Sequence, residues 1–566
     1  MAIFDYKDKN VPQIIRDALI VNELNFQTRV HADYHFSGEG GWRVLTEKDL
    51  NYQGAAGKYD EFRGESLPYS GAEASVLGQY DDRGRLTKIG IGFWATGTYK
   101  DAGADSQQNT FWDVISNLST AALADYADNY VRNSFNNLMG SVVDFAKAHG
   151  LSGEDVTVSG HSLGGMAVNS MATLSAKGAW DGFFNDASYI ALASPTQNQQ
   201  NSSVLNIGYE NDPVFRVLDG HSLSWASLGN HDDPRATATN NIVNFEEHYA
   251  GRDGESPLMS IANPAAWSAH DGIDYSSGIS RLLDSELYNF THRDSTVVVS
   301  NLSPDDAQRV WVRDLNKSIP HSGTTYIVGT GGRDLLHGGS GNDYLSGGKG
   351  NDDFHDSGGY NIFYGGEGVN RYVTNASPVE MAFSLDKNGD LYARDNAGGI
   401  TRGSDIQRVK SSADGALDYA VTADGLKAGN SLIHYQDSYF AGADNNFTLS
   451  VTGNNSWLFA ENGDSALTIS GNNNSVISGS GNDRFDLAGN GNTLLFYGDF
   501  GHDAIYNISR SDSLVFMANA NIADRDSVQN HVSYANNSAE LTFGDSSVTL
   551  VGVTASTLSD MHIVIA

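Results

Sequence analysis

The sequence contains no cysteine and is poor in basic residues. The lack of cysteine excludes disulfides, thiol catalysis and thiolate metal sites. Lysine and arginine number 35 against 69 aspartates and glutamates, a formal net charge of −34. Such a charge argues against nucleic acid or an anionic membrane as an electrostatic partner. No apolar run approaches the roughly 18 residues of a membrane-spanning helix.

Residues 1–9 lack a basic segment followed by an apolar one, so we expect no secretory signal peptide. The length of 566 residues predicts two or more domains. The acidic surplus has two interpretations, a solubilising surface or a set of oxygen-ligand cation sites. Zinc proteases are excluded, since the sequence has no H-E-x-x-H motif.

One short stretch carries a recognisable chemistry. Val156–Val158 is typical of a buried strand and Met166–Ala176 of a helix. The Gly160–Gly164 segment between them fits G-x-S-x-G, a tight turn that exposes a serine hydroxyl above a sheet. Ser162 is therefore the candidate nucleophile, and the N–H of Leu163 is a candidate oxyanion donor. A glycine-rich turn without chemistry is the alternative.

The surrounding chain has a mixed α/β texture. Lys88–Phe93 and Val204–Tyr209 are typical of strands, and the spacing over Phe135–Ala148 predicts a helix that stops at His149-Gly150. Strands alternating with helices favour a largely parallel sheet. Asn109–Asp125 is amphipathic and is either an ordinary core helix or a mobile lid over an apolar pocket.

A nucleophilic serine needs a base and an orienting acid. In enzymes with this turn the chain order is serine, acid, histidine, which excludes His149 as the base. Asp212 follows a strand and is the candidate acid, since open α/β sheets place reactive groups at the carboxyl ends of strands. Spacing alone does not choose among the candidate bases His221, His231, His248, His270 and His292.

From about residue 322 the sequence changes abruptly. A nine-residue repeat runs through 329–373 and returns around 479–505, matching G-G-x-G-x-D-x-U-x, the repeat of a calcium-binding parallel β-roll. A low-complexity linker is the alternative. Glycines expose carbonyls and aspartates supply carboxylates, so the candidate calcium ligands are Asp334, Asp343, Asp352, Asp483 and Asp503 with Gly331, Gly332, Gly339, Gly341, Gly348 and Gly350. We expect calcium to drive folding of the roll.

The remaining sequence is rich in short alternating runs. Ala382–Leu385 and Phe447–Val451 predict β structure, and strand-like runs fill the end of the chain after Leu541. The fold class we expect is an N-terminal α/β-hydrolase domain over 1–321, then a parallel β-roll and a β-sandwich-like region over 322–566.

The motifs together resemble a known family. Gly160-His-Ser-Leu-Gly-Gly165, Asn206–Phe215, the nonapeptides and Val548–Val553 are similar to those of bacterial RTX-type lipases exported by ABC transporters. That family includes polyester polyurethanases. The resemblance implies Ser162 as nucleophile, Asp212 as acid and His270 as base, with Leu163 and Thr96 binding the oxyanion.

The resemblance also implies features around the triad. A lid near 104–125 would open at a lipid–water interface. A calcium site in the catalytic domain would use Glu210, Asp232, Asn240 and Asn241, with Asp113 as a ligand in the lid. Three positions depart from the family. Asn240 and Asn109 replace aspartates, which should weaken those sites, and Trp94 replaces an arginine.

Export and activity follow as expectations. An uncleaved C-terminal signal near 545–566 would engage an ABC-type exporter, giving type I secretion of a monomer to the extracellular space. We expect a calcium-dependent ester hydrolase that acts on triacylglycerol or polyester at an interface. Alternatives are a phospholipase A with the same triad, or a calcium-binding adhesin or toxin without turnover.

Overall fold

The computed structural model describes residues 3–7, 9–31, 33–66, 69–94, 124–197, 203–218, 238–251, 263–293, 295–317, 321, 323–415, 417–441, 447–517 and 528–565. The chain divides into two compact units. The N-terminal unit comprises 3–284 and 316–320, and the C-terminal unit comprises 285–315 and 321–566. The boundary at 321 expected from the sequence stays a prediction.

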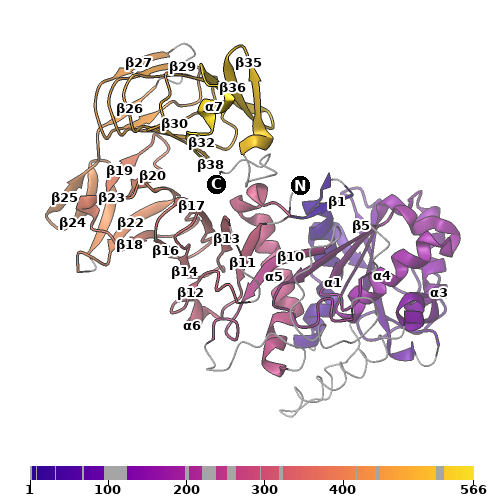
Figure 1. The fold of residues 1–566 in the computed structure, drawn as a ribbon. Helices are drawn as coiled ribbons and strands as arrows, with labels where there is room; N and C mark the ends of the chain where they lie inside the picture. Colours follow the sequence, from indigo (N-terminus) through magenta and orange to yellow (C-terminus); the bar gives the residue numbers. More distant parts are fainter. Residues whose placement is uncertain are drawn as a thin grey trace. The chain divides into compact units, whose positions relative to one another are not determined.

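The N-terminal unit is built on a mostly parallel sheet (Figure 1). Its strand order is β10-β9-β8-β7-β6-β5-β3, with β4 also paired to β5. The strands from β6 to β10 run parallel, whereas β3, β4 and β5 pair antiparallel. Their bounds are β3 Trp42–Val44, β4 Phe62–Arg63, β5 Glu73–Tyr80, β6 Leu86–Phe93, β7 Val156–His161, β8 Ser188–Leu192, β9 Val204–Tyr209 and β10 Ala238–Phe245. The predicted parallel α/β sheet is confirmed.

Helices pack against this sheet (Figure 1). Their bounds are α1 Pro12–Val30, α3 Ala124–Ala148, α4 Leu163–Ala176 and α5 Gly272–Asp284. The predicted helix at 135–148 is the second part of α3, which is interrupted by non-helical angles at Phe135. Glu65 satisfies the N–H groups that the interruption exposes, accepting from Asn137 at 3.1 Å and Leu138 at 2.8 Å.

The alternation of β6 explains how helices cover both faces. Ile89, Ile91 and Phe93 point into one apolar cluster with residues of α3 and α4. Gly90 and Gly92 point the other way, toward α1, where a Cβ at Gly90 would come within 2.3 Å of Val21. Glycine on that face therefore lets α1 lie close against the strand.

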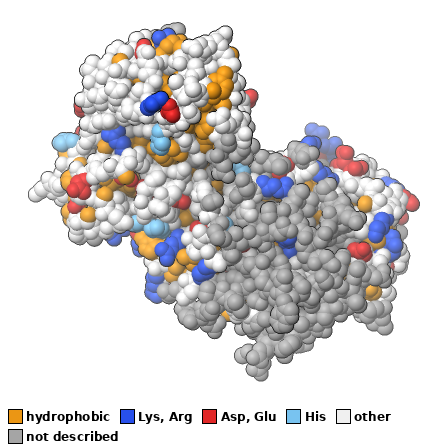
Figure 2. Space-filling view, viewed as in Figure 1, with side chains coloured by type: hydrophobic (Ala, Val, Ile, Leu, Met, Phe, Trp, Pro, Cys, Tyr) orange, Lys and Arg blue, Asp and Glu red, His pale blue; other side chains and the backbone are white. Residues whose placement is uncertain are grey.

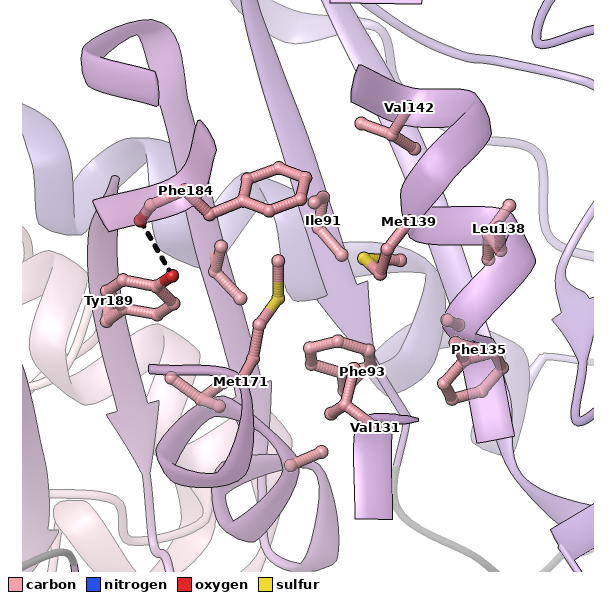
Figure 3. Packing of buried hydrophobic residues seen from close by; sticks show 14 of the residues in the cluster. Ile91, Phe93, Val131, Phe135, Leu138, Met139, Val142, Met171, Phe184 and Tyr189 are labelled. Atoms are coloured by element: carbon pink, nitrogen blue, oxygen red, sulfur yellow. Dashed lines mark hydrogen bonds between the residues drawn. The ribbon is translucent and has the colours of Figure 1, made fainter. Parts of the chain in front are cut away.

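The core between β6 and its helices is tightly interlocked. Figure 3 shows Phe93 beside Phe135, and their ring centroids are 5.7 Å apart. Met171 of α4 lies in the same cluster. The Tyr189 hydroxyl, buried there, donates to the Phe184 carbonyl at 2.9 Å, so the polar atom costs little.

The C-terminal unit begins with a parallel β-roll whose strands alternate between two sheets. One sheet has the order β11-β13-β15-β17-β21-β20-β19, and the other the order β12-β14-β16-β18-β22-β23-β24-β25. The bounds are β11 Thr296–Ser300, β12 Trp311–Val312, β13 Thr325–Val328, β14 Leu335–His337, β15 Asp343–Ser346, β16 Asp353–Asp356, β17 Tyr360–Tyr364, β18 Asn370–Thr374, β19 Ala382–Leu385, β20 Leu391–Arg394, β21 Ile400–Ser404, β22 Ile406–Ser411, β23 Asp418–Thr422, β24 Gly425–Ala428 and β25 Ser431–His434. The first coil, β11 and β12, precedes any nonapeptide.

A second parallel β-roll follows, in the place of the β-sandwich-like region expected from the sequence. It accounts for much of the sequence that lacked a clear repeat. Its two sheets have the orders β26-β28-β30-β32-β34-β38 and β27-β29-β31-β33-β37-β36-β35. The bounds are β26 Ser438–Phe440, β27 Phe447–Val451, β28 Trp457–Phe459, β29 Ser465–Ile469, β30 Ser475–Ile477, β31 Arg484–Leu487, β32 Thr493–Tyr497, β33 His502–Tyr506, β34 Ser513–Met517, β35 Val532–Ala535, β36 Ser538–Phe543, β37 Ser546–Val551 and β38 His562–Ile565. The predicted strands at 382–385, 447–451 and after 541 are confirmed.

The second roll has a thin apolar core between its sheets. Leu458 and Leu494 come from one sheet and Leu467 and Phe485 from the other, all within one buried cluster. On the face in Figure 2, atoms of the rolls are mostly uncharged, with acidic and basic side chains scattered among them. Among the residues that the structure describes, no helix has the length and apolar character needed to cross a membrane.

Replacing Phe485 with alanine should weaken the second roll, because a ring fully removed from water would leave a cavity in a narrow core. We expect the opening free energy of residues 447–517 to fall by about 3–5 kcal/mol. Hydrogen–deuterium exchange with calcium present measures it. Tyr534→Ala is the matched control, since that ring is 44% exposed; equal effects of the two changes would contradict the assigned core.

Candidate active site and calcium-binding rolls

Ser162 lies at the junction of β7 and α4, in the geometry of a nucleophile elbow. Its backbone angles are φ 59° and ψ −123°, which a non-glycine residue rarely adopts. The Ser162 N–H donates to the Leu192 carbonyl at 2.9 Å, and its own carbonyl accepts from Met166 at 3.1 Å. The strained turn is thus anchored to the neighbouring strand and to the first helical turn.

The two glycines of the motif are required by crowding of the backbone. A Cβ at Gly160 would lie 2.4 Å from the Gly164 carbonyl oxygen. A Cβ at Gly164 would lie 2.1 Å from the Phe93 carbonyl oxygen. Backbone atoms cannot yield as a flexible side chain does, so β6, β7 and α4 meet at this point only because both positions lack side chains.

Three side chains distant in the sequence form a hydrogen-bonded chain beside the elbow. His270 Nε2 lies 2.9 Å from Ser162 Oγ, and His270 Nδ1 lies 2.9 Å from one carboxylate oxygen of Asp212 and 3.1 Å from the other. Ser162 and Asp212 are only 6% and 4% exposed. A hydroxyl, an imidazole and a carboxylate in this order can transfer the serine proton and stabilise the resulting imidazolium.

Each partner is positioned by its own local structure. Asp212 follows β9, and its Oδ1 accepts the N–H groups of Val214 at 2.8 Å and Phe215 at 3.4 Å. Asp212 Oδ2 accepts a hydrogen bond from the Tyr275 hydroxyl at 2.7 Å. With the two contacts to His270 Nδ1, the Asp212 carboxylate makes five contacts with four donor groups, so the direction of its oxygens is fixed.

His270 ends a short 3₁₀ helix, Pro264–His270, which Asn263 caps by accepting from Ala265 at 3.2 Å. Its ring packs against two other rings. The centroid of His161 is 4.7 Å away and that of Trp267 is 6.0 Å away. These contacts limit rotation of the imidazole, because both neighbours come from regular elements or a capped turn.

Some of the candidate site residues predicted from the sequence lie together beside Ser162, some lie away from it, and some are outside the described residues. Ser162, Asp212 and His270 converge, and Leu163 begins α4, where the first N–H groups have no intrahelical acceptor. Two other candidate bases, His248 and His292, are buried and are not part of this hydrogen-bonded chain. Positions outside the described residues are Thr96, Asp113, His221, His231, Asp232 and nearly all of the expected lid.

Of the expected calcium site near the triad, the structure describes only parts. Glu210 is buried after β9, and its N–H donates to the Ile242 carbonyl at 2.7 Å. Asn241 is half-buried on β10, and Asn240 precedes it on the same strand. Trp94, the position that departs from the family, is buried and donates from its ring nitrogen to Ser75 Oγ at 3.2 Å. The calcium roles of Glu210, Asp232, Asn240, Asn241 and Asp113 stay predictions.

Sequence reasoning missed Tyr275 of α5. It lies five residues after His270 in no motif that a single sequence could flag, and only the folded chain brings its hydroxyl to Asp212. A buried tyrosine with a charged acceptor is a signal that needs coordinates.

In the rolls, aspartates of successive coils form ladders, in which the backbone N–H of one residue donates to the side-chain oxygen of the equivalent residue in the next coil. The N–H of Asp334 donates to Asp352 Oδ1 at 2.8 Å, and the N–H of Asp483 donates to Asp503 Oδ1 at 2.7 Å. In each pair the other oxygen of the second residue, Oδ2, is buried and has no hydrogen-bond partner. An oxygen in that state is costly unless a cation contacts it.

Burial raises the pKa values of the aspartates in the rolls, because it disfavours the charged form. It raises the pKa of Asp343 to about 7, that of Asp352 to about 8, that of Asp483 to about 7 and that of Asp503 to about 9. The nearest carboxylates add to the effect, Asp334 at Asp352 and Asp483 at Asp503. A bound dication would reverse this penalty, so the residues fit calcium.

The glycines fit the same ion. A Cβ at Gly350 would lie 2.2 Å from the Gly332 carbonyl oxygen of the preceding coil, so the turns bring carbonyls close together. Within the described ranges, no three histidine, aspartate or glutamate side chains cluster as a metal site. Carbonyl oxygens at these turns can join the aspartate carboxylates in an all-oxygen ligand set, which suits calcium better than zinc.

One edge of the second roll has a different ladder. There the N–H of Ser456 donates to Asn474 Oδ1 at 2.8 Å, and the N–H of Asn474 donates to Asn492 Oδ1 at 3.0 Å. Asn492 donates in turn to Asp512 Oδ1 at 2.8 Å, and Asp512 Oδ2 accepts from Ser509. Neutral amides thus make the same backbone contacts without an uncompensated charge.

The comparisons agree with this architecture. Residues 321–354 match the family described as RTX calcium-binding nonapeptide repeat (4 copies). The structure is similar to the crystal structure of the extracellular lipase LipA from Serratia marcescens, with a TM-score of 0.88 and 39% sequence identity. The match covers 100% of this chain and 100% of the LipA chain.

This chain belongs to the RTX-type bacterial lipase family. The predicted fold class, calcium as the bound ion and the resemblance are thereby confirmed. Two lipases of Pseudomonas fluorescens are 47% identical over 295 residues and 44% identical over 290 residues. These matches cover 52% and 51% of this chain. The chain spans less than two thirds of those relatives, 61% and 64% of their lengths.

The elbow gives a direct mutational prediction. Gly164→Ala places a Cβ against the Phe93 carbonyl, so we expect a loss of at least about 2 kcal/mol in unfolding free energy and loss of the Ser162 geometry. Thermal denaturation and labelling of Ser162 by an organophosphonate measure both. Gly140→Ala in α3 is the matched control, because nothing lies within 4 Å of its Cβ position. A harmless Gly164→Ala would contradict the backbone crowding.

Proposed function

We propose that this chain hydrolyses carboxylic esters of lipids through an acyl-enzyme on Ser162. The observation that carries the proposal is the continuous set of hydrogen bonds from Ser162 through His270 to Asp212. In the first step His270 Nε2 takes the Oγ proton as oxygen attacks the ester carbonyl, and Asp212 stabilises the imidazolium.

The second half of the reaction uses the same groups. The imidazolium returns its proton to the leaving alcohol, and a water activated by His270 then cleaves the acyl-enzyme. The N–H of Leu163 at the start of α4 is proposed to bind the oxyanion, with Thr96 as the second contact. The relatives are named lipases, which supports a lipid ester as substrate, with triacylglycerol our first choice.

Export is part of the proposal. The Serratia relative is named an extracellular lipase, and the calcium-binding repeats suit a medium rich in that ion. We propose that this chain also acts outside the cell and leaves it as a monomer through an ABC-type exporter that recognises the C-terminus.

Ser162→Ala should abolish turnover, because no other group in the chain of hydrogen bonds can form the acyl-enzyme. We expect kcat to fall by about 10⁴-fold or more on a soluble short-chain ester and on emulsified triacylglycerol. Ser175→Ala, on the same helix with its hydroxyl bonded to Asn185, is the control and should keep activity. Retained esterase activity in Ser162→Ala would end the proposal; activity on phospholipid but not triacylglycerol would favour a phospholipase.

We propose further that calcium holds the edge of the second roll that carries Asp483 and Asp503. Both carboxylates are 2% exposed, and each has one oxygen without a hydrogen-bond partner. The opposite edge, with Asn474 and Asn492, is proposed to close without the ion, since an amide oxygen accepts the same N–H and carries no charge.

Chelation should therefore act on the two edges unequally. Removing calcium should speed hydrogen–deuterium exchange at the N–H groups of Ser465 and Asp483, which donate to the charged ladder, far more than at Asn474 and Asn492. Asp503→Asn should raise the thermal midpoint without calcium and reduce the rise that calcium gives, because the charge is removed and the bond is kept. Asn492→Asp is the matched reverse change; uniform exchange along both edges would refute the asymmetry.

A further inference from the structure

Tyr275 makes contacts that the proposed reaction does not yet use. Its hydroxyl donates to Asp212 Oδ2 at 2.7 Å, the oxygen that also lies 2.9 Å from His270 Nδ1. The Tyr275 side chain is fully buried in α5, so no water competes for this bond. A bond to a charged acceptor in such a setting is among the stronger kinds.

The direction of the hydroxyl proton is fixed by a second bond. The backbone N–H of Tyr209, the last residue of β9, donates to the Tyr275 oxygen at 2.8 Å. Since that donor occupies an acceptor site of the phenol, the one phenolic proton is directed at Asp212. Burial and the nearby Asp212 charge raise the pKa of Tyr275 well above its ordinary value, so the hydroxyl keeps its proton at any working pH.

The ring of Tyr275 is also tied to the imidazoles. It contacts His161 with centroids 5.3 Å apart, and His161 in turn packs 4.7 Å from His270. The same residue therefore fixes the carboxylate by its hydroxyl and the packing behind the base by its ring. No other described side chain except His270 donates to Asp212.

We infer that Tyr275 is a positioning residue of the hydrolytic reaction, which holds the Asp212 carboxylate in the orientation that His270 requires. The inference rests on the proposed function. It assigns Tyr275 two effects. The hydroxyl keeps Asp212 Oδ2 directed at Nδ1, and it takes part of the carboxylate charge that would otherwise act on the imidazolium alone.

Tyr275→Phe tests this assignment, because it removes one oxygen and keeps the ring contacts. We expect kcat to fall about ten-fold with little change in KM, as for the loss of one hydrogen bond to a charged group. The acid limb of the kcat/KM profile should move to higher pH, by about half a unit, since more of the carboxylate charge then favours protonated His270.

The pH dependence of Ser162 labelling by a small organophosphonate gives a second readout that no lipid interface affects and that only folded enzyme produces. Its acid limb should move with that of kcat/KM. Tyr189→Phe is the matched control: that tyrosine is equally buried, its hydroxyl donates to a backbone carbonyl, and its profile should not move. An unmoved limb in Tyr275→Phe overturns the inference, because a merely structural hydroxyl would change only the thermal midpoint.

The labelling experiment distinguishes failure of the proposed function from failure of the Tyr275 inference. Labelling that persists in Ser162→Ala would show that the reacting group is elsewhere, whatever Tyr275→Phe does. Labelling that is lost in Ser162→Ala, with an unmoved limb in Tyr275→Phe, would reject only the role of the tyrosine.

Discussion

The close approach of three backbone segments at Ser162 is the constraint on which the N-terminal unit depends. Phe93 at the end of β6, Gly160 at the end of β7 and Gly164 in α4 meet where a single Cβ would overlap a carbonyl. At this crowded point Ser162 has a positive φ that non-glycine residues rarely adopt, and its hydroxyl lies 2.9 Å from His270 Nε2. Asp212 and His270 can reach it because β9 and the 3₁₀ helix before α5 end at the same side of this turn.

The C-terminal unit obeys a different rule, in which each coil is fixed to the next by a backbone N–H and a side-chain oxygen. Aspartate and asparagine make that bond equally well, with distances of 2.7–3.0 Å. They differ in charge and in one group, since asparagine has an amide NH₂ donor where aspartate has a second carboxylate oxygen. On the calcium proposal, the choice between them decides which edge needs the ion, while the backbone bond from coil to coil is the same.

Several parts of the fold and of the candidate site could be predicted from the sequence, because they depend on residues that are close together in the chain. The elbow, Asp212 at a strand end and the first aspartate repeats are all set by short-range rules, and the sequence was sufficient for them. His270 was one of five histidines until the resemblance selected it, because the distance along the chain carries no geometry. Tyr275 was not predicted at all. In the second roll only the repeat around 479–505 was recognised, because serine and asparagine stand at the aspartate position in other coils.

The rolls also tolerate interruptions between coils. The hairpin β19–β20 is inserted after β18, yet β17 still pairs in parallel with β21 and β18 with β22. In the second roll one coil spans 20 residues where others span 18, and both edges keep their bonds. The unit of construction is the coil and not the nonapeptide. Such a scaffold can acquire loops or whole hairpins at its turns during evolution, and an engineer could place a binding segment there without altering the strands.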